Sequence, residues 1–170
     1  SGGGYAQRVR FPGRPDLDRQ GPVEVKFNSV SSNCLELLGI PVLRGRGFDE
    51  NDQFRGPLVA LISERAAERF WPGEDALGRT IRIGEGEGRE YRIAGIVRNA
   101  PVNQIGETPE PYIYLPFWRD PTDEVTLIVD AGAHPVAISR QIRASLASLN
   151  PRLDPYSLIT LEDLIQFSAV

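Results

Sequence analysis

Three stretches of sequence, each interrupted by glycine or proline, set the order of the structural elements in this chain. They read LLGIPVLRGRGF at residues 37–48, AERFWPGEDALGRTIRI at residues 67–83 and YRIAGIVR at residues 91–98. Glycine permits left-handed backbone and proline lacks an amide donor, so both residue types tend to end helices and strands. The pattern therefore predicts short helices and strands that are joined by tight turns.

The first stretch completes a predicted strand–helix–strand unit. Residues 23–30 alternate apolar and polar side chains, as in a strand with one buried face. Ser31 or Ser32 is expected to cap a short helix, and Gly39 sits where that helix needs a left-handed residue to end. Pro41 then stands near the start of a second strand or on a sheet edge.

A second unit of this kind is predicted near the C-terminus. Residues 125–129 (VTLIV) are strongly β-prone, and residues 156–160 (YSLIT) form its last strand. Between them, Pro135 suits the first position of a helix that ends at Asn150, because Pro151 disfavours a helical predecessor. The apolar stripe of this helix consists of Ile138, Ile142, Leu146 and Leu149.

The middle of the chain is predicted to be rich in strands. Residues 58–62 are apolar on both faces and are expected to form a buried strand. Ser63 is expected to cap a helix over residues 64–70, which Pro72 and Gly73 stop. Further strands are expected at residues 79–83, 90–97 and 112–117, with a solvated, glycine-rich hairpin tip at residues 84–88.

These elements favour an α+β fold with two lobes. The β-α-β units at the chain ends, residues 23–47 and 119–170, are expected to form one lobe. Residues 48–118 are expected to form a β-rich lobe that is inserted between them. Residues 1–22 are rich in glycine, proline, arginine and aspartate, and are expected to form a flexible N-terminal segment.

The composition argues against several classes of function. The 170 residues carry a net charge of −4, which is unsuited to a nucleic-acid surface or a polybasic contact with anionic lipid. The longest aliphatic run, residues 58–62, is far shorter than the roughly 20 residues of a membrane-spanning helix. The chain has no methionine and no visible signal peptide, so we expect it to be an internal piece of a longer protein.

Few side chains offer reactive chemistry. The chain has one histidine and one cysteine, so no catalytic, cofactor-binding or metal site is predicted. His134 is expected to be a polar helix cap, and Cys34 a small buried side chain that forms no disulfide within the chain. Lys26 is expected on a solvated strand face.

The acidic residues after Phe48 leave two interpretations. Asp49, Glu50 and Asp52 lack the ligand spacing of an EF-hand loop and are expected to form a solvated turn. A carboxylate pair of the kind that glycosidases use stays open, and it would make the chain a carboxylate-dependent hydrolase. The glycine-rich tip matches neither a P-loop nor a dinucleotide-binding loop.

The aromatic residues also allow two interpretations. Trp71 either buries its ring beneath a turn that Pro72 enforces, or stands exposed as a hot spot for a partner, and we favour the buried ring. The same choice applies to four aromatic residues further along the chain, Tyr112, Tyr114, Phe117 and Trp118.

Taken in order, these motifs resemble the MacB-like periplasmic core domain of ABC transporter permeases, the MacB/FtsX-like family, over roughly residues 23–167. The resemblance rests on five motifs: LGIPVLRGR at residues 38–46, FWPG followed by LG within residues 70–78, GIV at residues 95–97, PYIYLP at residues 111–116 and LNP at residues 149–151. It gives nine residues a structural role in the motifs: Gly39, Pro41, Gly45, Trp71, Pro72, Gly73, Gly78, Gly95 and Pro116.

The resemblance implies a non-catalytic domain outside the bacterial inner membrane, held between the first two of four transmembrane helices. The lobe built from both chain ends would be porter-like and the inserted lobe sabre-like. Cytoplasmic ATP hydrolysis would move the domain, for export or for mechanotransmission. The implied partners are a cytoplasmic ATPase subunit or domain, a second permease copy and a periplasmic adaptor, with no cofactor and no nucleic acid. The alternative function is a soluble periplasmic module that binds a ligand or a protein.

Overall fold

A computed structural model describes residues 5–100, 109–119 and 125–150 of the chain. These residues fall into two compact units, Gly3–Thr126 and a unit that begins at Leu127, and each is treated by itself. The elements of the first unit are β1 (Tyr5–Arg10), α1 (Pro15–Asp18), β2 (Val23–Val30), α2 (Cys34–Leu37), β3 (Val42–Gly45), α3 (Glu50–Phe54), β4 (Val59–Ser63), α4 (Glu64–Phe70), β5 (Thr80–Ile83), β6 (Arg89–Val97), β7 (Tyr112–Pro116) and the 3₁₀ helix η1 (Phe117–Arg119). The second unit contains α5 (Pro135–Leu149).

The first unit is built on a seven-stranded sheet that closes on itself. The strand order is β3-β6-β4-β7-β2-β1-β5, and β5 pairs with β6 as well as with β1. Six strands therefore form a complete ring, and β3 pairs with the last residues of β6, beyond the part of β6 that pairs with β5. Ring closure satisfies the backbone hydrogen bonds at edges that an open sheet would expose.

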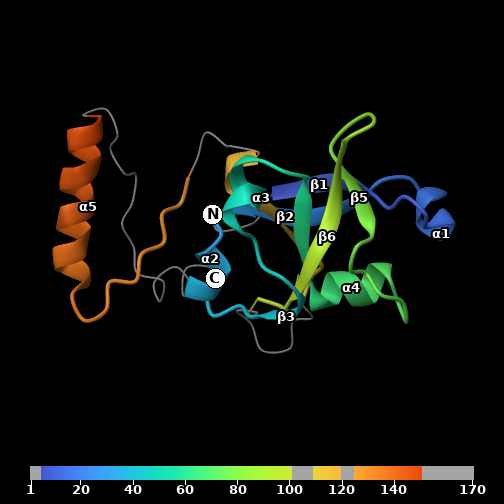
Figure 1. The fold of residues 1–170 in the computed structure, drawn as a ribbon, viewed down its shortest axis with the longest axis horizontal. Coiled ribbons are helices and arrows are strands. Elements are labelled where there is room, and N and C mark those ends of the chain that lie inside the picture. The colour runs from blue at the N-terminus through green and yellow to red at the C-terminus, as the bar shows by residue number, and fades with distance from the viewer. Residues whose placement is uncertain (1–4, 101–108, 120–124, 151–170) are drawn as a thin grey trace, which may run out of the picture. The chain divides into compact units, whose positions relative to one another are not determined.

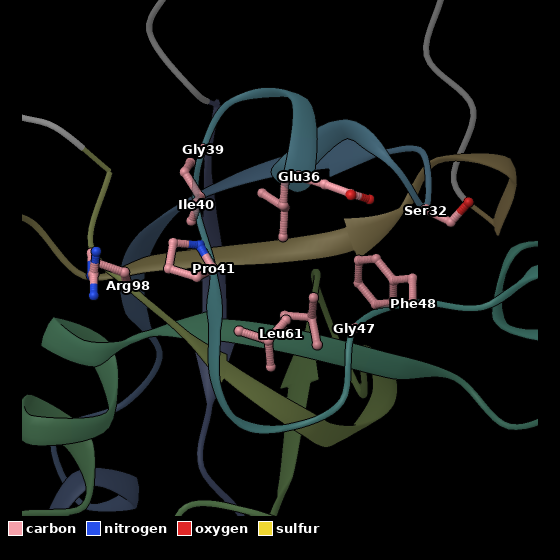
Figure 2. A pocket seen from close by; sticks show the side chains of 11 residues that line it. Ser32, Glu36, Gly39, Ile40, Pro41, Gly47, Phe48, Leu61 and Arg98 are labelled. Atoms are coloured by element: carbon pink, nitrogen blue, oxygen red, sulfur yellow. The ribbon is translucent and has the colours of Figure 1, made fainter.

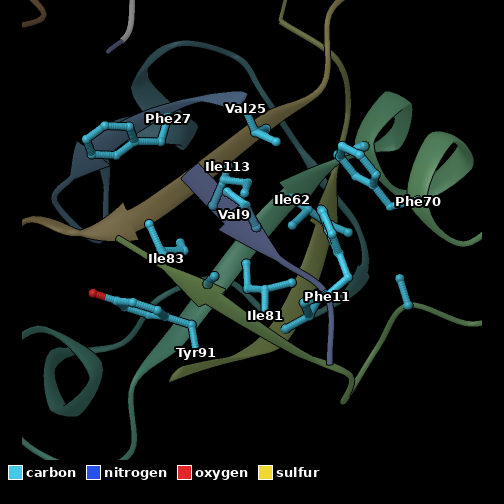
Figure 3. Close-up of a cluster of buried hydrophobic side chains, with 14 of the residues drawn as sticks. Val9, Phe11, Val25, Phe27, Ile62, Phe70, Ile81, Ile83, Tyr91 and Ile113 are labelled. Atoms are coloured by element: carbon cyan, nitrogen blue, oxygen red, sulfur yellow. The ribbon is translucent and has the colours of Figure 1, made fainter. Parts of the chain in front are cut away.

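Alternate side chains of the ring serve two separate cores. In β4, Ala60 and Ile62 belong to the larger cluster, whereas Val59 and Leu61 belong to the smaller one. The two-residue period of a strand places these pairs on opposite faces, which explains why the whole of β4 is buried. Figure 3 shows the larger cluster, where side chains from β1, β2, β4, β5, β6 and β7 point toward one another. The prediction of a strand that is buried on both faces is confirmed.

The N-terminal residues are ordered where the sequence predicted flexibility. Residues 5–10 form β1, which pairs antiparallel with β2 and with β5. Val9 and Phe11 are buried in the larger cluster, and the arginines between and beside them point outward. The prediction of a flexible segment over residues 1–22 is thus wrong for this strand. Its charged residues alternate with apolar ones, and this alternation carries more information than the average composition.

The sheet joins strands that the sequence assigned to different lobes. β2 pairs in parallel with β7, and β3 pairs antiparallel with β6. Both pairings cross the predicted boundary between residues 47 and 48. The observed fold is a mixed α/β fold dominated by one sheet, and the division into a porter-like and an inserted lobe stays a prediction.

Of the predicted second β-α-β unit, the described residues contain the helix. Helix α5 begins at Pro135 and ends before Asn150, as expected. Residues 125–129 adopt no strand and pair with no strand in the described ranges, so that prediction is wrong. A β-prone run becomes a strand only where a neighbour takes up its backbone hydrogen bonds. The strand predicted at residues 156–160 lies outside the described residues.

Local turn chemistry was predicted more accurately. β5 and β6 form an antiparallel hairpin around residues 84–88, which projects from the sheet in Figure 1. Ser63 caps α4 through its hydroxyl, which accepts the N–H of Ala66 at 3.2 Å. At α2 the capping position belongs to Asn33, and no side chain makes the capping bond. Ser31 instead donates its hydroxyl to the Asn33 side chain at 2.9 Å, so the prediction of a serine cap is wrong.

Candidate functional site

A pocket of about 460 Å³ lies beside the smaller core, between α2, the chain that leads into β3, and β4 (Figure 2). Most of its lining is apolar, with Glu36 and Ser32 on the α2 side and Arg98 just beyond the end of β6. The described residues that line it are Ser32, Leu35, Glu36, Gly39, Ile40, Pro41, Val42, Gly47, Phe48, Leu61 and Arg98. An apolar cavity of this size with a few polar groups is typical of a small-molecule site.

The wall of the pocket depends on how α2 ends. Gly39 adopts a φ of +66°, and its N–H donates to the Glu36 carbonyl at 3.0 Å. The N–H of Ile40 donates to the Leu35 carbonyl at 2.8 Å. This left-handed ending turns the chain sharply, so that Ile40 is buried and Pro41 lies beside the pocket, just before β3 begins. The sequence prediction of a left-handed Gly39 is confirmed.

The pairing of β3 with β6, on the side of β3 away from the pocket wall just described, depends on two glycines. Gly45 ends β3 with a φ of +74° and lies opposite Gly95 of β6. A methyl group on Gly45 would collide with the Ala94 carbonyl oxygen, and one on Gly95 with the Arg46 carbonyl oxygen. The backbones of β3 and β6 can approach this closely only without side chains at both positions.

Within the acidic turn after Phe48, Asp49 and Glu50 are exposed as predicted, whereas Asp52 is a buried anchor. Asp52 is 5% exposed, and its carboxylate accepts two hydrogen bonds from the guanidinium of Arg46, one of them at 3.0 Å. Asp49 and Asp52 also form a reciprocal capping box at the start of α3, with N–O distances of 2.9 and 3.0 Å. The prediction of a solvated turn is therefore wrong for Asp52.

Electrostatics at Asp52 follow from this geometry. Burial disfavours its charged form, but the bonds from Arg46 and from the Asp49 N–H outweigh burial and hold the pKa of Asp52 below its ordinary value of 3.8. The carboxylate is therefore ionised at neutral pH and fully engaged by neighbours. It fixes the start of α3 and offers no proton for chemistry.

The Trp71 corner is structural. Trp71 is 3% exposed, and its ring meets the Phe11 ring edge-on at a centroid distance of 5.5 Å. Phe11 also stacks on Phe70 at 4.3 Å, and Arg14 donates to the Phe70 carbonyl. The predicted buried ring is confirmed. The contacts to this corner come from β1 and the residues that follow it. The sequence prediction of a flexible N-terminus had missed them.

The remaining motif residues occupy turns and the core. Pro72 and Gly73 are exposed, and Gly73 adopts a φ of +72°. Gly78 has a φ of +75° and donates its N–H to the Ile93 carbonyl at 2.9 Å. Pro116 is fully buried at the end of β7. Of the nine motif residues, Gly39 and Pro41 line the pocket, and Gly45 and Gly95 fix the neighbouring strand pair.

The four aromatics of the β7 region divide between the two interpretations. Tyr114 is buried in the smaller core, and Tyr112 packs partly buried against it. Trp118 is 57% exposed and stacks on the exposed Phe54 ring at a centroid distance of 5.8 Å. The backbone N–H of Trp118 also donates to the Gln53 side-chain oxygen at 3.3 Å, which ties η1 to α3.

The side chains considered for chemistry are not gathered into a reactive site. His134 stands at the capping position of α5 but its side chain makes no capping bond, which corrects its predicted role. Cys34 is half-buried on α2, and burial raises the pKa of its thiol. Lys26 is exposed and pairs with Glu110.

The described ranges lack two kinds of feature. Within residues 5–100, 109–119 and 125–150, no three metal-ligating side chains come together. Nor does any helix in those ranges have the length and apolarity to cross a bilayer.

The structure thus defines a mixed α/β domain with a closed sheet, glycine-dependent turns and a small apolar pocket. The family model of the MacB-like periplasmic core domain matches residues 5–145. The chain therefore belongs to the MacB-like periplasmic core domain family. Such domains are periplasmic parts of ABC-type transporter permeases.

Individual relatives are distant in sequence. The macrolide export ATP-binding/permease protein MacB of Wolinella succinogenes is 21% identical over 148 residues, which cover 82% of this chain and 23% of that protein. The chain thus spans about a quarter of the length of this curated relative.

Two solved structures share the fold. The periplasmic region of MacB from Actinobacillus actinomycetemcomitans aligns with a TM-score of 0.67 at 16% identity, over 98% of this chain and 72% of that one. A domain of a putative permease protein from Porphyromonas gingivalis aligns with a TM-score of 0.57 at 17% identity, over 96% of this chain and 79% of that one.

Sequence reasoning missed the pocket. Its polar residues come from two separate places in the chain, Ser32 and Glu36 at α2 and Arg98 after β6, and they form no motif. The turn at Gly39–Pro41 was recognised as structural punctuation, but its position over Leu61 of β4 depends on the sheet pairing. Nothing in the sequence alone indicates that pairing.

Proposed function

We propose that this chain is a non-catalytic extracytoplasmic domain of an ABC-type permease, which relays ATP-driven motion to processes outside the inner membrane. ATP would be hydrolysed by a cytoplasmic ATPase subunit or domain. The domain would contribute shape and stiffness, used for export or for mechanotransmission. Membership in the MacB-like periplasmic core domain family supports this role.

The closed sheet is the observation that carries the mechanical part of the proposal. A relay must move as one body, because compliance between its parts would absorb the displacement. In residues 3–126 six strands pair in a ring, and the ring encloses the larger core. Displacing one strand would break hydrogen bonds on both of its sides and open a close-packed interior.

The proposal extends to partners and to the arrangement of the parent protein. The domain would face a second copy of itself, since two permease halves commonly work together in such transporters. A periplasmic adaptor would receive the motion. We also retain the porter-like and inserted lobes as part of the proposal, with α5 as the helix of the unit near the C-terminus.

Electron paramagnetic resonance on the full-length parent permease tests this function. Cys34→Ser removes the one thiol of these 170 residues, any cysteine elsewhere in the parent is replaced too, and Glu87→Cys then places a spin label on the exposed hairpin tip between β5 and β6. We expect the distance distribution between labels on two copies to change when ATP and vanadate trap the transporter. A variant that binds ATP without hydrolysing or trapping it is the control. A distribution that is identical with and without trapping would contradict the relay.

A further inference from the structure

The pocket beside α2 has a charge on each side of an apolar floor. The floor is formed by Ile40, Pro41 and Leu61 together with their neighbours. Glu36 projects from α2, and Arg98 follows β6. In Figure 2, Arg98 lies at one end of the pocket, and Ser32 and Phe48 lie at the other, with α2 above.

Within the described residues, neither charged side chain contributes a polar contact to the fold. Throughout the described ranges, the Arg98 guanidinium and the Glu36 carboxylate make no hydrogen bond or ion pair. Two other arginines near β3 behave differently: Arg44 pairs with Asp75 at 2.7 Å, and Arg46 with Asp52. Backbone contacts secure residue 98 itself, since its N–H donates to the Pro41 carbonyl at 3.0 Å. The backbone of residue 98 is therefore held at the pocket rim, and no described residue pairs with its guanidinium, which leaves it available to bind an anion.

We propose that this pocket binds a short apolar peptide in its zwitterionic form. Its carboxylate would pair with Arg98, its ammonium group with Glu36, and its apolar side chains would cover Ile40 and Leu61. Arginine presents a planar fork that matches a carboxylate, and a volume of about 460 Å³ suits a dipeptide or tripeptide rather than a folded partner. An apolar ligand without charged groups would leave both charges unpaired.

This inference does not depend on the mechanical role. Every lining residue that the structure describes lies within Gly3–Thr126, so these residues form the pocket within one compact unit of a single chain. Relaying motion without binding a peptide, and binding a peptide without relaying motion, are two different experimental outcomes. Peptide titration of the 170-residue chain distinguishes them, because it requires neither the membrane helices nor ATP.

Isothermal titration of the whole chain with trileucine tests the proposal. We expect saturable binding with one site. Trileucine amide, which lacks the carboxylate, should bind about tenfold more weakly, and Arg98→Gln should weaken binding of the free acid by a similar factor. In Arg98→Gln the acid and the amide should bind equally, because both changes remove the same ion pair. The same comparison applies at the ammonium end of the peptide. N-acetyl-trileucine lacks the ammonium group, and Glu36→Gln removes the carboxylate that would pair with it.

Two variants serve as controls. Arg82→Gln removes an exposed arginine of β5 that pairs with Glu90 away from the pocket, and it should leave trileucine affinity unchanged. Val42→Trp fills the pocket from an exposed position on β3 and should abolish binding while circular dichroism stays native. The proposal is overturned if the folded chain shows no saturable binding of trileucine. Equal affinity for the acid and the amide on the unmodified chain overturns it as well.

Discussion

Gly45 and Gly95 lie directly opposite each other where β3 pairs with β6, and each is packed against a backbone carbonyl oxygen. A Cβ on Gly45 would strike the Ala94 oxygen, and a Cβ on Gly95 would strike the Arg46 oxygen. The two glycines therefore let the strands lie closer than side chains would permit. The position of β3, and with it one wall of the pocket, depends on this approach.

Gly95→Ala should destabilise the chain by about 1–3 kcal/mol, because its methyl group would meet the Arg46 carbonyl and come within 3.0 Å of the Leu61 side chain. Urea unfolding measures this loss. Gly47→Ala is the matched control, since its methyl group would meet Val42 at an ordinary 3.6 Å. It should change stability by less than about 0.5 kcal/mol. Equal effects at the two positions would contradict the close approach.

Gly39 tests backbone strain without steric collision. A Cβ at Gly39 would meet nothing within 4 Å, yet its φ of +66° disfavours every other L-residue. Gly39→Val should therefore cost on the order of 1–3 kcal/mol in urea unfolding. Gly39→Asn should cost clearly less, because asparagine tolerates the left-handed region better than a β-branched residue does. A valine variant as stable as the asparagine variant would refute the left-handed ending of α2.

Predictions from the sequence succeeded where local chemistry decides the structure. Gly39, Ser63 and the tip at residues 84–88 each act within a few residues of their own position, so glycine stereochemistry and hydroxyl capping suffice. The burial of β4 on both faces was also evident, since every residue from Leu58 to Ile62 is apolar.

Pairing over long sequence distances could not be predicted in the same way. β2 pairs with β7 across more than 80 residues, and no residue in either strand specifies that partner. Strand β1 was missed because its arginines dominate the composition, although Val9 and Phe11 alternate with them. Asp52 was predicted to be solvated because only the folded turn brings its partner, Arg46, next to it.

The Arg46–Asp52 pair should make stability depend on pH in the acidic range. The pKa of Asp52 lies below 3.8 in the folded chain, so its contribution is fully present above the unfolded value. That contribution is lost as the pH falls through the lower, folded value. Asp52→Asn should cost about 1–3 kcal/mol at pH 7, and the difference from the unmodified chain should shrink below about pH 4. Urea unfolding at several pH values measures both.

An exposed ion pair provides the comparison for Asp52. Arg82 and Glu90 pair at 3.2 Å between β5 and β6, with both side chains about half exposed. Glu90→Gln should have a much smaller effect at pH 7, because solvent screens the pair. If Asp52→Asn and Glu90→Gln behave alike at neutral pH, the carboxylate of Asp52 is not anchored as described.

Ser63 joins three elements through one hydroxyl. It accepts the Ala66 N–H at the start of α4 and the Tyr112 N–H at the start of β7, at 3.2 and 3.0 Å, and it is 1% exposed. Ser63→Ala would leave both buried donors without their acceptor, so it should destabilise the chain by about 1–3 kcal/mol. Hydrogen exchange at these two amides should accelerate at the same time.

Ser29 supplies the opposite case on strand β2. Its hydroxyl is buried and has no hydrogen-bond partner among the described residues. Ser29→Ala removes an unsatisfied polar group, so the chain should be as stable as before or slightly more stable. The two serine-to-alanine changes delete the same atom from buried sites, and only the bonds around that atom differ. A loss at Ser29 that matches the loss at Ser63 would mean that packing of the oxygen, rather than its two hydrogen bonds, holds β4, α4 and β7 together.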